Sequence, residues 1–243
     1  MKVSLLRLTG PMISFGASSV NEDSPTWPHP SLSMLTGLIA NARGYKRRET
    51  GRHQRLQQAV SYAAREDCPG EKVTDYQTAD LDLPHMRATT KSDSVAWTTW
   101  GHLDNRGGGN ASSGIAQRER EYWADSIYTV ALHIEGLSAE EIERSLRRPE
   151  RPLFIGRKCC LPSEEIFQGT VQVQSLKEAL FQPETIPTGS DGEKLTPTRL
   201  WHFSQEGRPI SDRKDWETGL FTGTRHVKEE ELSAPTPPGA RDT

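Results

Sequence analysis

The apolar positions of the first 65 residues predict one strand followed by two helices. Residues 3–9 (VSLLRLT) form a short, mostly apolar run closed by a Gly-Pro pair, as expected of a strand entering a turn. After a proline-rich loop, Ser31 or Ser33 is a suitable N-cap for a helix whose apolar side chains share one face over 35–42. The spacing of apolar residues predicts a second helix over 53–65.

The middle of the chain predicts two more strands, a helix and a further strand. Residues 73–79 (VTDYQTA) resemble a strand, and residues 126–136 (SIYTVALHIEG) give the clearest strand pattern in the sequence. Ser138 and Glu141 have the spacing of a capping box at the start of a helix. The apolar run 151–156 (RPLFIG) then predicts a short buried strand.

In chain order these elements are β, α, β, a long insertion, β, α, β, which predicts an α+β fold of the ferredoxin-like or RRM-like type. We expect residues 1–180 to form this domain, with the polar, glycine-rich insertion 80–118 projecting as a β-hairpin. Residues 169–174 alternate like an edge strand. Residues 181–232 predict a β-rich extension in which 200–210 pairs with 220–227, and 233–243 has the composition of a disordered tail.

Composition narrows the class of protein. Hydrophobic residues make up 33% of 243, and no run approaches the roughly 18 apolar residues of a membrane helix, so we expect a cytoplasmic protein with no membrane contact. The three cysteines cannot form a disulfide framework, and we expect Cys159 and Cys160 to pack as small side chains.

Charge is segregated along the chain although the net charge is only −3. Residues 43–55 and residues 144–158 each carry six Lys or Arg against a single Glu. Basic segments of this kind suit RNA, because Lys and Arg bind phosphates. A solvated helix face explains 43–55 equally well, and an exposed strand end is the alternative for Gly156-Arg157-Lys158.

Motifs for other chemistry are absent from the sequence. It contains no phosphate-binding loop, no HExxH and no CxxC, so we expect neither a metal nor a cofactor. A metal-free ribonuclease needs only an acid, a base and a cation, with no fixed spacing. Tyr45, His53, His102 and Lys158 are the residues that such an activity would use.

A set of short motifs resembles the fifth CRISPR-associated (Cas) protein family, in particular its type I-E members. The motifs follow the family's order from about residue 3 to 180, and this order is more specific than any one motif. They are LTGPMISFG, WPHPSLSMLTGLIANARGYKR, DYQT, WTTWGHLDNRGG, REYWADSIYTVAL and RRPERPLFIGRKCCLPS.

The resemblance implies an RRM-like fold whose insertion 80–118 is a protruding thumb. It also implies a non-catalytic, antiviral role in the ribonucleoprotein complex Cascade, in which such subunits grip the 5′ handle of CRISPR RNA (crRNA). Implied partners are the backbone subunit and the large subunit that reads the PAM, with target DNA reached through the complex. A related protein of a sister subtype is a nuclease, so a metal-independent endoribonuclease acting on CRISPR repeat RNA is the alternative.

Carried over by motif, the implied RNA contacts lie in the SFG turn, at the first helix, in the basic run, in and beside the thumb, and in GRK. They are Ser14, Phe15, Ser31, Ser33, Asn41, Arg47, Arg48, Arg106, Arg118, Arg120, Arg157 and Lys158.

Overall fold

A computed structural model gives the fold. It describes residues 1–18, 23–80, 95–97, 103–105, 115–189 and 192–232. The chain divides into two compact units. The first holds Met1–Ser18, Pro25–Val73 and Tyr122–Thr243, and the second holds Ser19–Ser24 and Thr74–Glu121.

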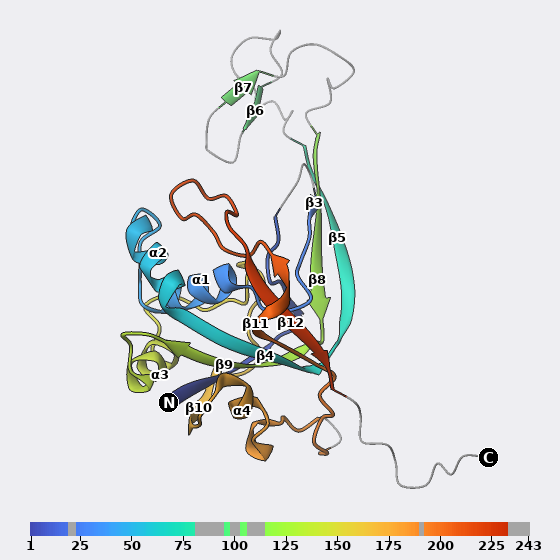
Figure 1. The fold of residues 1–243 in the computed structure, drawn as a ribbon. Coiled ribbons are helices and arrows are strands. Elements are labelled where there is room, and N and C mark those ends of the chain that lie inside the picture. Colours follow the sequence, from blue (N-terminus) through green and yellow to red (C-terminus); the bar gives the residue numbers. More distant parts are fainter. Residues whose placement is uncertain (19–22, 81–94, 98–102, 106–114, 190–191, 233–243) are drawn as a thin grey trace, which may run out of the picture. The chain divides into compact units, whose positions relative to one another are not determined.

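A six-stranded antiparallel sheet is the framework of the first unit (Figure 1). Its strand order is β10-β1-β9-β4-β11-β12. The strands are β1 (Lys2–Thr9), β4 (Val60–Cys68), β9 (Ile127–Ile134), β10 (Phe167–Gln172), β11 (Arg199–Ile210) and β12 (Arg225–Glu231).

The sheet is covered on both faces, which explains the nearly continuous apolar run of β1. Successive side chains of a strand point to opposite faces. Leu6 and Leu8 therefore join a large cluster with the first and third helices, while Val3 and Leu5 join a smaller cluster with the fourth. Figure 1 shows α1 and α4 on opposite sides of the sheet.

The helices are α1 (Leu32–Ala42), α2 (Thr50–Ala59), α3 (Ala139–Arg147) and α4 (Leu176–Leu180), followed by a 3-10 turn, η1 (Pro183–Thr185). Two predicted caps are confirmed. Ser31 Oγ accepts a hydrogen bond from the Met34 amide at 3.2 Å, and Ser138 and Glu141 form the reciprocal capping box that starts α3.

The second unit is built on a long β-strand, β8 (Ile115–Ala124), whose last residues belong to the first unit. β5 (Glu71–Asp80) pairs with β8, and β3 (Asp23–Ser24) lies parallel to it. The short strands β6 (Val95–Trp97) and β7 (Leu103–Asn105) pair with each other. Most of the expected hairpin 80–118 lies outside the described residues, as does the expected tail 233–243. Within the first unit, β2 (Met12–Ile13) pairs with the end of β8.

Three sequence predictions are wrong in detail. The predicted helix 53–65 ends at Ala59, and β4 takes over from Val60 because that segment pairs with β9 on one side and with β11 on the other. Segment 73–79 is a strand, but it lies in β5 and not in the central sheet. Segment 151–156 is not a strand, and β10 is the strand that pairs with β1.

Two predictions about strands are confirmed. β10 is an edge strand, as the alternation over 169–174 indicated. The C-terminal segments pair as predicted through β11 and β12, with Phe203 opposite Val227. Among the described residues, no helix is both long and apolar enough to cross a membrane.

Candidate nucleic-acid interface

The GRK sequence forms a tight turn that is docked on the segment around Ser14. The Ile155 amide donates to the Cys160 carbonyl at 2.8 Å, and the Ser14 amide donates to the Ile155 carbonyl at 3.2 Å. Gly156 has φ +88°, and a Cβ there would lie 1.7 Å from the Ser14 carbonyl oxygen. Glycine is therefore required, both for the left-handed backbone and for the close approach of the two chains.

This turn presents two cations beside a tyrosine. The Arg157 guanidinium lies 4.6 Å from the centroid of the Tyr122 ring, and Lys158 is exposed. A cation held over an aromatic face is oriented before any ligand arrives. An exposed ammonium next to an oriented guanidinium is suited to contacting two phosphates of a backbone.

The paired cysteines differ from each other, so the expectation that both pack as small side chains is half wrong. Cys160 is fully buried, and burial raises the pKa of its thiol to about 12. Cys159 is exposed, and its Sγ lies 3.6 Å from the Tyr122 hydroxyl. Cys159 therefore belongs to the surface of the turn.

Four of the implied RNA contacts are buried and serve the fold. Phe15 is 0% exposed and packs edge-on against Tyr128, with ring centroids 4.9 Å apart, so its ring is not available for base stacking. Ser31 caps α1, and Ser33 lies 3.3 Å from it, hydroxyl to hydroxyl. Ser14 is also buried, although its hydroxyl has no hydrogen-bond partner among the described residues.

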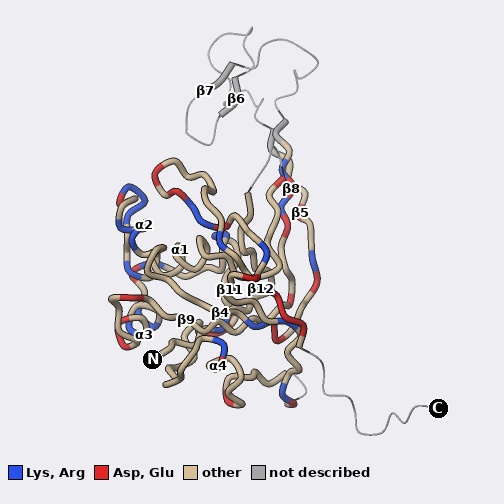
Figure 2. Tube along the Cα trace, in the orientation of Figure 1, with Lys and Arg blue, Asp and Glu red and all other residues tan. Residues whose placement is uncertain are grey.

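The basic run 43–55 surrounds the loop between α1 and α2. Arg47 and Arg48 are exposed, whereas Asn41 is half-buried and donates to the Pro152 carbonyl at 2.8 Å. Figure 2 shows the lysines and arginines gathered on this loop and on α2. Pro152 is five residues before Arg157, so an extended chain of about 17 Å at most links the loop to the GRK turn.

The segment between β11 and β12 extends this basic surface, and the sequence analysis did not predict it. The side chain of Gln57 on α2 is buried, and it bonds both the amide and the carbonyl of Lys214 at 3.1 and 2.9 Å. Burial, and then the charge of Arg47, lower the pKa of Lys214. A glutamine in a polar helix carries no signal for this contact, because its partner lies 157 residues away.

The candidate nuclease residues are not assembled into one site. Tyr45 and His53 do meet, with ring centroids 5.7 Å apart, but His53 is buried and stacked on Trp216 at 4.7 Å. Lys158 belongs to the separate GRK turn, and His102 lies outside the described residues. The described part of the chain also holds no group of three or more His, Cys, Asp or Glu that could bind a metal ion.

The remaining implied contacts belong to the second unit. Arg118 and Arg120 lie on β8 and are half-buried. Arg106 lies outside the described residues.

The first unit is thus an antiparallel α+β framework that presents exposed and oriented cations on the GRK turn and on the loop between α1 and α2. Comparison with known proteins gives the family. The sequence description of the family "CRISPR-associated protein (Cas_Cas5)" matches residues 4–230, and the chain belongs to this family.

Individual relatives agree with this assignment. The chain is 29% identical over 190 residues to the CRISPR system Cascade subunit CasD of Escherichia coli (strain K12), covering 77% of this chain and 78% of the relative. A chain of a solved "CRISPR RNA-guided surveillance complex" has the same fold, with a TM-score of 0.66 and 22% identity over 94% of this chain and 89% of that one. A solved Cas protein matches with a TM-score of 0.60 and 25% identity over 96% of this chain and 95% of that one.

Proposed function

We propose that this chain is a non-catalytic subunit of a Cascade-type surveillance complex and that it binds the 5′ handle of crRNA. Membership of the family and the likeness to a Cascade subunit support the first part. The GRK turn carries the second part, because it holds Arg157 over Tyr122 and exposes Lys158 on a backbone that cannot shift without displacing Ser14.

The arrangement of the central sheet supports an RRM-like assignment. Strands β1, β4, β9 and β10 come first, second, third and fourth along the chain, and they lie side by side in the order fourth, first, third, second. Helices follow the first and third of them. This is the order of a ferredoxin-like βαββαβ unit, and the segment between β5 and β8 is where we place the thumb.

We assign the handle contacts to exposed polar groups. Lys158, Arg157 and the basic loop supply phosphate contacts. Phosphate contacts fix the position of the RNA on the protein, whereas contacts with base edges read its sequence. Arg106, Arg118 and Arg120 are the candidate contacts of the thumb. The buried Ser14, Phe15, Ser31 and Ser33 act by shaping the backbone against which the GRK turn rests.

The neighbouring backbone and large subunits are the proposed protein partners, in the cytoplasm, with target DNA reached through the complex. The alternative, an endoribonuclease, needs a base and an acid that reach the scissile phosphate. The burial of His53 between two rings argues against that role.

Co-expression with the neighbouring subunits, followed by purification and sequencing of bound RNA, tests the proposal. RNAs that share one repeat-derived 5′ end are expected. Purified complexes that contain this chain but no RNA would contradict handle binding. Incubation of the purified chain with labelled repeat RNA in EDTA tests the nuclease, and specific cleavage that is lost in His53→Ala would refute the non-catalytic assignment.

Salt dependence tests the two cations of the turn. For single strands the slope of log affinity against log salt is roughly 0.7 per phosphate contact, so a variant with both Arg157→Ala and Lys158→Ala should lose about 1.4 of slope. When the salt concentration rises from 50 to 200 mM, the factor by which the affinity of the variant falls should therefore be about sevenfold smaller than the factor for the wild type. The matched control carries Arg144→Ala on α3 and Arg148→Ala directly after it, where both side chains are exposed. An unchanged slope in the GRK variant would make the turn purely structural.

A further inference from the structure

Strand β4 has an edge that no described strand covers. Its pairing with β11 runs from Glu66 to Ala63, where Ala63 lies opposite His202, and then stops. β4 nevertheless continues back to Val60, paired with β9 on its other side. A register shift in β11 between Phe203 and Arg208 accompanies its departure from β4. The first residues of β4 therefore have a free edge in the described part of the chain.

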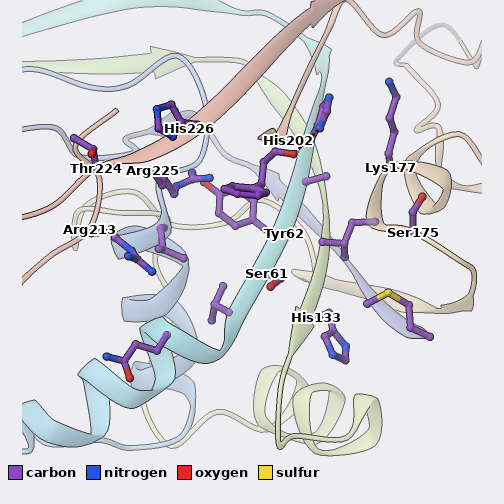
Figure 3. A pocket seen from close by; sticks show the side chains of 17 residues that line it. Ser61, Tyr62, His133, Ser175, Lys177, His202, Arg213, Thr224, Arg225 and His226 are labelled. Carbon is purple, nitrogen blue, oxygen red and sulfur yellow. Dashed lines mark hydrogen bonds between the residues drawn. The ribbon is translucent and has the colours of Figure 1, made fainter. Parts of the chain in front are cut away.

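A cavity of about 740 Å³ runs along this edge (Figure 3). Four consecutive residues of β4, Val60 to Ala63, line it. Because successive side chains of a strand point to opposite faces, a cavity over one face would be lined by every second residue only. A cavity lined by all four must follow the edge itself, where the main-chain N–H and C=O groups are.

The lining of the cavity is basic. Among the described residues, no aspartate or glutamate lines it. The lysine, arginine and histidine side chains that line it are Lys177, Arg213, Arg225, His133, His202 and His226, which Figure 3 shows on both sides of β4.

Carboxylates behind the lining neutralise part of this charge. Arg225 is paired with the buried Asp212 at 2.7 Å, and Lys177 with Glu230 at 2.5 Å. Arg213 is exposed and belongs to no ion pair among the described residues. The cavity therefore keeps a free positive charge at the side where Arg213 lies.

An apolar side chain stands at the point where β11 leaves the edge. Phe203 is 62% exposed, the second most exposed of the large hydrophobic side chains among the described residues, and it lines the cavity. Burying such a ring would stabilise a complex, because apolar surface would be removed from water.

We propose that the Val60–Tyr62 edge binds an extended, acidic segment of a neighbouring protein chain, which adds to the central sheet as a strand. An uncovered strand edge is a template for another backbone, and main-chain pairing gives affinity while side-chain pockets give specificity. Free positive charge selects a segment with carboxylates, and Phe203 selects an apolar side chain beside them. A single strand of nucleic acid fits less well, because phosphates and sugars cannot satisfy the alternating donors and acceptors of a strand edge.

This inference rests on the proposed function, because the neighbouring chain is taken to be another subunit of the complex. The test uses the full chain co-purified with its complex, with p-benzoylphenylalanine, a photo-reactive residue, in place of Phe203. We expect ultraviolet light to cross-link this position to another protein chain, and the mapped peptide to carry a net negative charge. A cross-link to RNA or DNA would overturn the proposal.

Hydrogen exchange provides the second measurement. The Tyr62 amide should exchange at least tenfold more slowly in the complex than in the isolated chain. It is the donor of this edge, because alternate residues of an antiparallel strand face opposite neighbours, Ser61 faces β9, and the Val60 amide already donates to the Leu56 carbonyl. Arg213→Glu should reduce the cross-link yield at least fivefold, whereas Arg148→Glu, at an exposed position directly after α3, should not. If amide exchange at this edge is equal in the free and the assembled chain, and the complexes still contain crRNA, strand addition at the edge is refuted and the proposed function stands. Absence of any RNA-containing complex would overturn both.

Discussion

The buried histidine of the core should make this protein less stable in mild acid. His29 is 1% exposed and lies between Trp27 and Trp201, with ring centroids 5.9 and 5.6 Å away. Its Nδ1 is 3.1 Å from the Pro30 carbonyl oxygen, and its Nε2 has no partner among the described residues. Burial lowers the pKa of His29 to about 4, against 6.5 ordinarily.

The sign of the effect follows from proton binding. Between pH 6.5 and 4 the unfolded chain holds a proton on His29 and the folded chain does not, so the free energy of unfolding falls as the pH falls. From pH 6.5 to pH 4 the free energy of unfolding falls by about 3 kcal/mol in total, because each pH unit contributes roughly 1.4 kcal/mol. Between pH 7 and pH 5 the expected loss is about 2 kcal/mol.

His29→Phe isolates this contribution, because it keeps a ring between the two indoles and removes the titrating group. The Pro30 carbonyl still accepts a hydrogen bond from the Tyr62 hydroxyl. Urea denaturation of both proteins at pH 7 and pH 5 should show that the wild type loses about 2 kcal/mol more than the variant. His226→Phe, at an exposed position on β12, is the control and should behave like the wild type. Equal losses in His29→Phe and the wild type would refute the reasoning.

Two further predictions concern the turn and the loop that shape the basic surface. Gly156→Ala should destabilise the chain by more than the roughly 1–2 kcal/mol of a left-handed backbone, because its Cβ would meet the Ser14 carbonyl. Gly136→Ala, with φ +78° and no neighbour within 4 Å, is the control, and equal thermal melting of the two variants would contradict the clash. Gln57→Leu should release the 213–216 loop and lower the free energy of unfolding by about 1–3 kcal/mol, because buried main-chain groups lose their partners. Trypsin should then cut that loop first, and an unchanged cleavage pattern would show that other contacts hold it.

Local chemistry determined much of the fold before any tertiary contact was known. The caps of α1 and α3 follow from Ser31, and from Ser138 with Glu141, because a cap needs only a side chain within three residues of the helix start. Strand β9 follows from its own apolar pattern. The family follows from motifs whose order along the chain is itself sequence information.

Tertiary structure decided which segments share the central sheet and which cations share a surface. Residues 60–65 have spacings that fit a helix, and they form a strand because β9 offers backbone partners along the whole segment and β11 offers them from Ala63 onward. Segment 151–156 is apolar like a strand, yet it forms the approach to the GRK turn because β10 already occupies the edge of β1. The contact of Gln57 with Lys214 joins residues far apart in the chain. The open edge of β4 likewise depends on where β11, far along the chain, stops pairing with it. No local spacing encodes such contacts, since strand partners and buried amide partners are selected by the packing of the whole chain.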